Sequence, residues 1–178
     1  MSRPLPAFTY HPDPLGTGAI EARPIQCVCC GDVQPYVYVG PVYGDGDLDE
    51  ELCPWCIADG SAASKLGASF ADDRSLCKAG VPEAVIAEVN QRTPAFTSWQ
   101  QEEWLAHCND ACEFHGDATV EEVRNASEQI KQDWRERYGL SEEDWKIATR
   151  DYVPAGHQAF YKFRCRHCRA ILLGWDCA

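Results

Sequence analysis

The chain has 178 residues, of which 45% are apolar and 25% charged, and its formal net charge is −12. This composition excludes a disordered chain, and the negative charge argues against binding to nucleic acid or to an anionic membrane, since both are polyanions. No apolar run is long enough to span a membrane, and the N-terminus lacks the apolar segment of a signal peptide. We therefore expect a soluble protein of the cytoplasm.

The eleven cysteines are the most informative part of the composition. Their number is odd, so disulfides could not pair all of them, and the cytosol keeps thiols reduced. Clustered cysteines in such a compartment are more often metal ligands or catalytic groups. Their spacing along the chain therefore indicates which of these two roles they have.

Two Cys-x2-Cys pairs lie in the first third of the chain, after a loop rich in proline and glycine. They are Cys27 with Cys30, and Cys53 with Cys56. Two such pairs that face each other place four thiolates around one zinc ion, with Zn–S bonds of about 2.3 Å. Between the pairs, YVYVG alternates like a strand and YGDGD is typical of a turn. The pattern predicts a zinc-ribbon-like β-hairpin module.

Two alternatives to zinc remain open for this first cluster. The CPWC sequence could be a redox-active dithiol, but such dithiols lie within βαβ units, and the sequence after Cys56 shows no such alternation. Rubredoxin has a similar spacing, and four sulfur ligands also suit iron. Cys29 lies inside the first pair and could replace Cys27 or Cys30.

Helical patterns fill much of the chain after residue 80. Thr97 and Ser98 are possible N-caps of one helix, and Ser141 is a possible N-cap of another. Thr119 and Glu122 have the spacing of a capping box at the start of the longest helix. The expected helices cover residues 81–91, 99–108, 120–138 and 142–149.

A third Cys-x2-Cys pair, Cys165 and Cys168, lies near the end of the chain between two strand-like stretches. We expect a β-hairpin with this pair at its tip. Cys108 and Cys112 are four residues apart, so on the expected helix they would share one face. These four cysteines could bind a second zinc ion.

Other interpretations of this second cluster also stay open. His107 could replace Cys108, and His115 could replace Cys112, because imidazole is an equally good zinc ligand. The simplest interpretation is that Cys108 and Cys112 are small buried residues of a helix, since free cysteine is often buried.

Together these features predict an α+β fold, in which β-hairpins that carry Cys-x2-Cys pairs are combined with a small helical region. Residues 1–66 would form the N-terminal loop and the zinc-ribbon-like module. Residues 67–178 would form the helical region, closed by a C-terminal β-hairpin that carries the second cysteine cluster. We expect both parts to form one compact unit.

An acidic stretch separates the two pairs of the first cluster. Residues 43–60 contain six acids and neither lysine nor arginine. Such a stretch can simply keep a protein soluble. Alternatively, it is a docking surface for a basic partner, because complementary charges accelerate association. The candidate docking residues are Asp45, Asp47, Asp49, Glu50 and Glu51.

The stretches FTYHPDPLGTGAIE, LCPWCIADGSAA and WLAHCNDACEFHGD, with the terminal FRCRHC, resemble the bacterial CbrC-like family. That family takes its name from colicin tolerance, and its members are thought to occur among immunity proteins of toxin systems. The resemblance implies the metal ligands Cys27, Cys30, Cys53, Cys56, Cys108, Cys112, Cys165 and Cys168.

The resemblance and the charge lead to one functional hypothesis. Nuclease toxins bind phosphate backbones and tend to be basic, so an acidic protein suits their neutralisation. The chain would then be a non-enzymatic, zinc-binding protein that gives immunity by direct binding of such a toxin. The alternatives are a zinc-dependent or thiol-based enzyme, or a redox protein.

Overall fold

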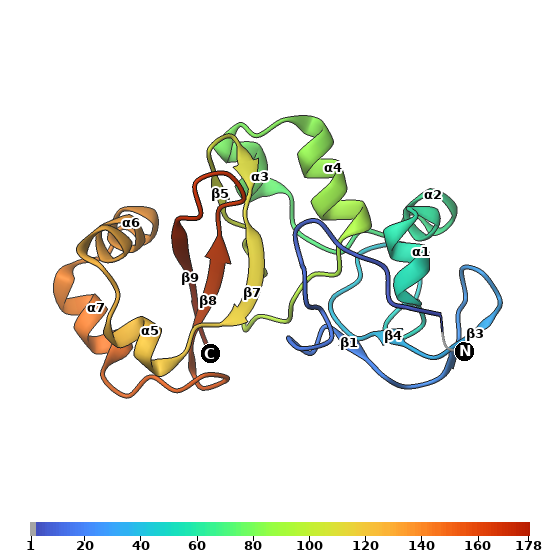
Figure 1. Cartoon of the computed structure of the whole chain (residues 1–178), viewed down its shortest axis with the longest axis horizontal. Coiled ribbons are helices and arrows are strands. Elements are labelled where there is room, and N and C mark those ends of the chain that lie inside the picture. Colours follow the sequence, from blue (N-terminus) through green and yellow to red (C-terminus); the bar gives the residue numbers. More distant parts are fainter. Residues whose placement is uncertain (1–2) are drawn as a thin grey trace.

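The computed structural model describes residues 3–178 and combines helices with small antiparallel sheets (Figure 1). The N-terminal strands and the helices α1 and α2 lie on one side of the molecule. The helices α5, α6 and α7 lie on the other side, and the strands β7, β8 and β9 lie between the two groups. This arrangement agrees with the predicted mixture of helices and β-hairpins.

The named strands pair only antiparallel. Three two-stranded sheets pair β1 with β4, β2 with β3, and β5 with β6, while the largest sheet has the order β7-β8-β9. The predicted C-terminal hairpin is β8 with β9. The bounds are β1 Ile20–Glu21, β2 Ile25–Gln26, β3 Val33–Gln34, β4 Val37–Tyr38, β5 Ala106–His107, β6 Asp110–Ala111, β7 Glu113–Asp117, β8 Gln158–Arg164 and β9 Ile171–Cys177.

The helices are short, and several begin where the sequence predicts. Thr119 and Ser141 each form a capping box, at the starts of α5 and α7. Gly139 ends α6 with a left-handed φ of 67°, as is common for glycine after a helix. The bounds are α1 Pro54–Ala58, α2 Ser61–Leu66, α3 Arg74–Ala79, α4 Glu83–Arg92, α5 Val120–Arg124, α6 Glu128–Tyr138 and α7 Glu142–Thr149.

Two helix predictions are wrong. The helix expected over residues 120–138 is interrupted, because the Ser127 hydroxyl accepts a hydrogen bond from the Ile130 amide and so starts a new helix, α6. Residues 99–108 form no helix. Trp104 and Leu105 are consecutive and both fully buried, which an extended segment with packed neighbours on both faces permits.

The zinc-ribbon plan is not reproduced in detail. The first Cys-x2-Cys pair lies at the tip of the β2–β3 hairpin, as a ribbon requires. The second pair instead opens the helix α1, where Cys53 is the N-cap and Pro54 occupies the first turn. Proline is favoured there because the first amides of a helix have no partner within it. A helix thus replaces the expected second hairpin.

The interior contains two groups of buried apolar side chains. The larger group includes residues from Phe8 to Leu172, and the smaller group lies between α5–α7 and the sheet. Strand β8 contributes to both, because Phe160 packs with the helices while Phe163 points to the larger group. The larger group joins residues from both predicted modules, and the boundary at residue 66 stays a prediction.

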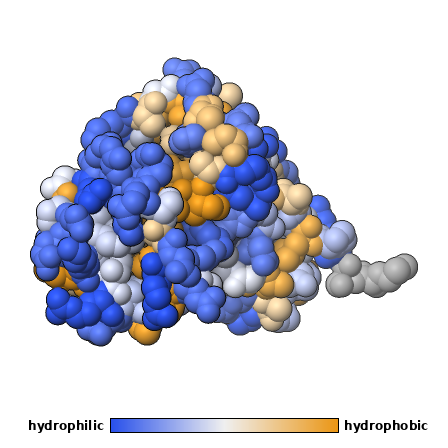
Figure 2. Space-filling model, turned by 60° about the vertical axis from the view of Figure 1, so that its left-hand side comes forward, coloured by the Kyte–Doolittle hydropathy of each residue, from blue (hydrophilic) through white to orange (hydrophobic). Residues whose placement is uncertain are grey.

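The exterior is mainly polar on the face shown in Figure 2, with separate apolar patches between the hydrophilic side chains. None of the helices in residues 3–178 is long and apolar enough to cross a membrane. The acidic residues predicted for docking lie on an irregular segment before α1, where their side chains are exposed.

His11 is the one histidine with no exposed surface in the described chain, and it fastens the N-terminal loop to the core. Its Nδ1 lies 2.7 Å from the carbonyl oxygen of Pro94, and its Nε2 lies 2.6 Å from the hydroxyl of Thr17. A carbonyl only accepts, so Nδ1 carries a proton and donates to Pro94. Burial lowers the pKa of His11 to about 4.

This pKa predicts a pH-dependent stability. Between pH 6.5 and about 4 the unfolded chain binds a proton at His11 that the folded chain does not, so the free energy of unfolding falls as the pH falls through this window. The limit for one such group is about 1.4 kcal/mol per pH unit. Urea unfolding of wild type and His11→Asn at pH 6.5, 5.5 and 4.5 should give a shallower slope for the variant.

Comparing wild type with His11→Asn separates the effect of His11 on the pH dependence of stability from that of the other titrating groups. Carboxylates with lowered pKa, such as Asp110, Glu113 and Glu122, also cost stability on acidification, but they do so equally in both proteins. Metal content is measured at each pH in both. Parallel slopes for the two proteins would contradict a neutral, buried His11.

Candidate metal centres

The first cysteine cluster has the dimensions of a metal site. The four sulfur atoms of Cys27, Cys30, Cys53 and Cys56 lie within 4.8 Å of one another. The Sγ atoms of Cys27 and Cys56 are 3.8 Å apart, and none of the four is in a disulfide. A tetrahedron with metal–sulfur bonds of 2.3 Å has edges of about 3.8 Å. The donor set therefore fits a tetrahedral ion.

The first pair lies on a tight turn, here called a knuckle, that the backbone fixes at both ends. The Gly31 amide donates to the Cys27 carbonyl at 2.7 Å, and the Cys27 amide donates to the Asp32 carbonyl at 3.0 Å. Gly31 has a φ of 75°, which glycine adopts without a Cβ clash. This turn aims both thiols of the pair at the same point.

Backbone contacts hold the second pair against this knuckle. The Val28 amide donates to the Glu51 carbonyl at 3.1 Å, and the Cys53 amide donates to the Cys27 sulfur at 3.3 Å. Cys27, Cys53 and Cys56 are buried in the larger apolar group. The cluster therefore joins the β2–β3 hairpin to α1 inside the core.

The ionisation of these thiols depends on their contacts with one another. A hydrogen bond from the Cys53 thiol lowers the pKa of Cys27 to about 4, and the same contact raises the pKa of Cys53. Burial raises the pKa of Cys56 to about 12. Four thiolates in this space need a compensating cation, because buried like charges repel one another.

The second cluster consists of three cysteines and one histidine. The ligand atoms of His107, Cys108, Cys165 and Cys168 lie within 4.8 Å of one another. The Sγ atoms of Cys108 and Cys168 are 3.8 Å apart, and His107 Nδ1 lies 3.2 and 3.3 Å from them. Tetrahedral zinc with one nitrogen ligand predicts an N–S distance of about 3.5 Å, so the fit is close.

A tight turn between β5 and β6 supplies the first two of these residues. Cys108 and Asn109 both have positive φ, 54° and 58°, as in the two-residue turns that favour asparagine. His107 ends β5 and pairs with Asp110 across the hairpin. The turn therefore presents an imidazole and a thiol side by side.

The other two ligands lie on a knuckle with the same backbone pattern as the first. The Arg169 amide donates to the Cys165 carbonyl at 3.1 Å, and the Cys165 amide donates to the Ala170 carbonyl at 2.8 Å. Arg169 has a φ of 65°, where the first knuckle has glycine. A left-handed conformation is strained for arginine, yet Arg169 adopts it at the position where the first knuckle has Gly31.

A buried carboxylate connects the two halves of the second cluster. Asp110 accepts hydrogen bonds from Tyr10 at 2.7 Å, from His167 at 2.8 Å and from Arg166 at 3.0 Å. Burial alone would raise the pKa of Asp110, but these donors lower it overall. Because His167 and Arg166 lie between Cys165 and Cys168, this contact fixes the knuckle against the β5–β6 hairpin.

Cys112, the fourth cysteine of the predicted set, lies outside this group, and His107 lies within it instead. The prediction assumed a helix, but a turn and strands separate Cys108 from Cys112. Cys112 is fully buried, its amide donates to Leu105, and burial raises its thiol pKa to about 12. It is the small buried residue of the simpler interpretation, although in a strand region.

The other candidate ligands lie outside both clusters. His115 is 3.1 Å from a carboxylate oxygen of Glu113, with which it forms an ion pair when protonated. Cys29 is not one of the four grouped residues, although its thiol contacts Cys56 at the edge of the first cluster and donates to the Ser61 hydroxyl at 3.4 Å. The structure thus brings together seven of the eight predicted cysteines, in two groups, and adds His107.

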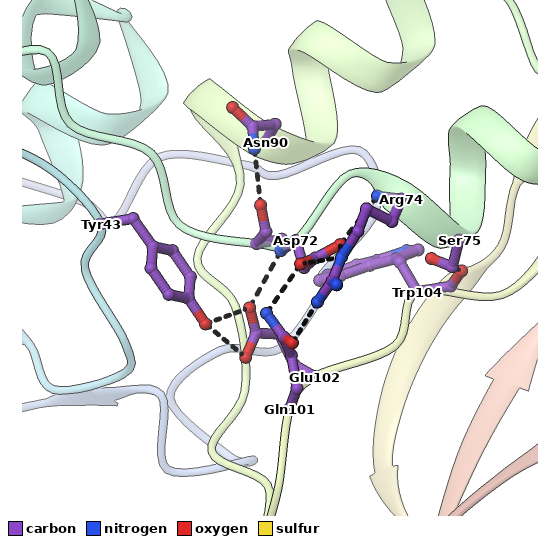
Figure 3. A network of polar contacts seen from close by, with 9 residues as sticks. Tyr43, Asp72, Arg74, Ser75, Asn90, Gln101, Glu102 and Trp104 are labelled. Atoms are coloured by element: carbon purple, nitrogen blue, oxygen red, sulfur yellow. Dashed lines mark hydrogen bonds and ion pairs between the residues drawn. The ribbon is translucent and has the colours of Figure 1, made fainter.

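Sequence reasoning missed a buried carboxylate at Glu102 (Figure 3). It accepts from the Tyr43 hydroxyl at 2.8 and 3.0 Å and from the Asp72 amide at 2.9 Å. Burial raises its pKa. Its partners come from separate segments, so the contact is a structural tie. An acid in a polar run gives no sequence signal of burial.

Fold and sites together define a mixed α/β protein with two cysteine-rich clusters that could hold metal ions. The chain belongs to the uncharacterised protein family UPF0167, whose model matches residues 5–177. A UPF0167 protein of Pseudomonas aeruginosa is 47% identical over 170 residues, which cover 94% of each chain. UPF0167 proteins of Mycobacterium bovis and Mycobacterium tuberculosis are each 46% identical over 181 residues, 98% of this chain and 94% of theirs.

No solved structure matches the chain. The names of the family and of these relatives mention neither the CbrC-like family nor colicin tolerance. The predicted membership of a little-known bacterial family is thus supported at the level of UPF0167. The link to toxin immunity gains no support from these names.

The geometry of the second cluster predicts different results for two substitutions. His107→Ala removes a donor that lies beside two sulfur atoms, so the protein should lose about one of two bound zinc ions. Cys112→Ala removes only a buried thiol, so zinc content should stay unchanged and stability should fall by about 1 kcal/mol. Elemental analysis after gel filtration measures both. If only the Cys112 variant lost zinc, the ligands of the second cluster would be the four cysteines predicted from the sequence and not His107.

Proposed function

We propose that this protein is a zinc-stabilised, non-enzymatic binding protein in which both clusters hold structural zinc ions. The observation that carries the proposal is the presence of four protein donors at tetrahedral spacing in each cluster. Catalytic zinc keeps one position open for water, whereas structural zinc is closed by four protein ligands. Each cluster offers the closed set.

Zinc is favoured over iron by the second cluster. Three sulfurs with one imidazole are a common structural zinc set. The first cluster, with four sulfurs, suits either metal, and iron there is the second candidate. One protein loaded with a single kind of ion is the simpler proposal, so we assign zinc to both.

Metal analysis tests this assignment. The purified protein should contain about two zinc ions per chain, and Cys53→Ala should lose one of them and melt at a lower temperature, because metal binding is part of the folding energy. Cys77→Ala is the matched control, since Cys77 is exposed on α3 and lies outside both clusters.

Three results would contradict the metal proposal. One is less than half an ion per chain in the wild type, and another is an equal melting temperature for the Cys53 and Cys77 variants. A red protein with bound iron would instead assign the first cluster to a rubredoxin-like ion.

We also propose that the partner is a basic protein, of the nuclease-toxin type. The net charge of −12 and the resemblance to the CbrC-like family support this proposal. Asp45, Asp47 and Asp49 are exposed and form no ion pair within residues 3–178, so their charges are available to a partner. Glu50 is paired with Arg23, and the backbone of Glu51 contacts the first knuckle.

Charge reversal tests the docking surface. Replacing Asp45, Asp47 and Asp49 by lysine should slow association with a basic nuclease toxin encoded beside the gene and flatten its salt dependence, because steering charges act mainly on the association rate. Zinc content should not change. Surface substitutions of this kind usually alter stability by at most about 0.5 kcal/mol each. Binding kinetics at low and high salt measure the effect.

A matched control reverses three other exposed acids. Glu136→Lys, Glu143→Lys and Asp151→Lys change the net charge equally, but these residues lie on or beside α6 and α7. If both triple variants slow association equally, the effect comes from net charge and the loop has no special role. If the wild type binds no toxin, the immunity proposal fails while the zinc proposal stands.

We propose the cytoplasm as the compartment in which the protein acts. All eleven cysteines are free in the structure, including the two groups at metal-site spacing. Thiols this close would oxidise to disulfides in a secretory compartment, whereas the cytosol keeps them available for metal.

A further inference from the structure

A cavity of about 580 Å³ lies apart from both cysteine clusters. Its walls come from the N-terminal loop at residues 16–19, from residues 96–99, from the end of β7 at residues 114–117, and from the β8 region. Two stretches that stand out in the sequence, HPDPLGTG and EFHGD, thus meet at one place. Neither stretch contributes a ligand to the two cysteine clusters.

A β-bulge shapes the meeting point. The register of β7 against β8 shifts between Phe114 and Asp117, and Gly116 in the shift has a φ of 82°. A Cβ at Gly116 would lie 3.2 Å from the Thr17 methyl group, so a side chain there would press on the loop. Bulges redirect side chains and occur often beside functional sites.

Aromatic rings form much of the cavity wall. The rings of Phe96 and Phe114 stack at 4.1 Å, and the Tyr161 ring lies 4.8 Å from Phe96. Ala159 lies on the same face of β8 as Tyr161, and its small side chain leaves room beside the phenol. Trp99 lines the same cavity and is half exposed. Because Phe96 and Phe114 are almost fully buried and stack on each other, the ring most open to a ligand is that of Trp99.

Two polar groups in this wall lack partners. The Tyr161 ring is buried, but its hydroxyl reaches solvent and has no hydrogen-bond partner within residues 3–178. Asp117 lies opposite Tyr161 in the β7–β8 pairing. One Asp117 oxygen accepts from the Ala155 amide at 2.7 Å, and the other has no partner among the described residues. Neither oxygen is enclosed in the core: both reach solvent, so both can accept from a donor on a ligand in the cavity.

The surroundings argue against an anionic ligand. The wall contains neither lysine nor arginine. The amides of the glycine-containing loop are already used within it: Gly16 donates to the Asp13 side chain, Thr17 to the Asp13 carbonyl, and Gly18 to the Leu15 carbonyl. A phosphate needs free amides or cations. His115, the remaining titratable group of the wall, is engaged with Glu113.

We propose that this cavity binds an organic cation, a guanidinium or ammonium group on a short apolar body. The charged group would donate to the free oxygen of Asp117 and to the Tyr161 hydroxyl, and the apolar body would lie against the half-exposed Trp99 ring. Sites of this size and composition, apolar with a few convergent polar groups, are typical of small-ligand pockets. The inference does not depend on zinc or on a toxin.

The organic cation that enters this cavity could come from two sources. A free small molecule could carry the cation, or an arginine side chain of a protein could enter the cavity. Calorimetry on the full-length, zinc-loaded protein distinguishes them with two probes, butylguanidinium and a capped Gly-Arg-Gly tripeptide. Butylurea, which is neutral and of similar shape, and butyl phosphate serve as the comparison ligands.

Butylguanidinium should bind the wild type, whereas butylurea and butyl phosphate should bind at least tenfold more weakly or not at all. Asp117→Asn should weaken butylguanidinium about tenfold, the usual effect of losing a charged hydrogen bond. Its Oδ1 can still accept from Ala155, so the fold is retained. Tyr161→Phe should weaken binding by a smaller factor, because the ring remains.

Asp45→Asn is the matched control, with the same loss of charge on an exposed loop, and should bind as the wild type does. Melting temperature and zinc content are measured for every variant. Binding of the tripeptide as tight as that of butylguanidinium supports a protein side chain, and binding of butylguanidinium alone supports a free metabolite. Equal binding of butylurea, no binding of either cation, or wild-type affinity in Asp117→Asn would overturn the proposal.

Discussion

The convergence of four thiols, three of them buried in the core, is the constraint on which the N-terminal half of the molecule depends. Each of the strands β1 to β4 is two residues long, and so short a ladder cannot hold itself together. The cluster around Cys27 instead connects the β2–β3 hairpin to α1 within the larger apolar group. Structural zinc contributes about 10–16 kcal/mol in small domains, which is comparable to the whole stability of many proteins.

The two clusters contain the same local backbone structure in different surroundings. Both knuckles have the same two backbone hydrogen bonds and a left-handed residue after the second cysteine, Gly31 in one and Arg169 in the other. The partner of the first knuckle is the start of a helix, and the partner of the second is a β-turn. The Asp110 carboxylate supplies in the second cluster the rigidity that core burial supplies in the first.

Several features of the fold and of the clusters could be predicted because they depend on residues that are close in sequence. Cys-x2-Cys spacing, the caps at Thr119 and Ser141, and the C-terminal hairpin depend on neighbours in sequence, and the structure contains all of them. The fourth donor of the second cluster was not predictable from helical spacing, because a turn at Cys108 exchanges His107 for Cys112. The Asn-Asp pair after Cys108 was the available signal for that turn. Burial of Glu102 depends on distant segments and leaves no local trace.

The two clusters differ most in their access to water, and this has a kinetic consequence. Three of the four residues of the second cluster are exposed, whereas three of the first are buried. An ion in the second cluster can be approached by a chelator or a competing thiol while the protein stays folded. In the first cluster only Cys30 is open to solvent, so release of an ion there should depend more on the opening rate of the surrounding core. One chain would thus hold a long-lived and an exchangeable ion.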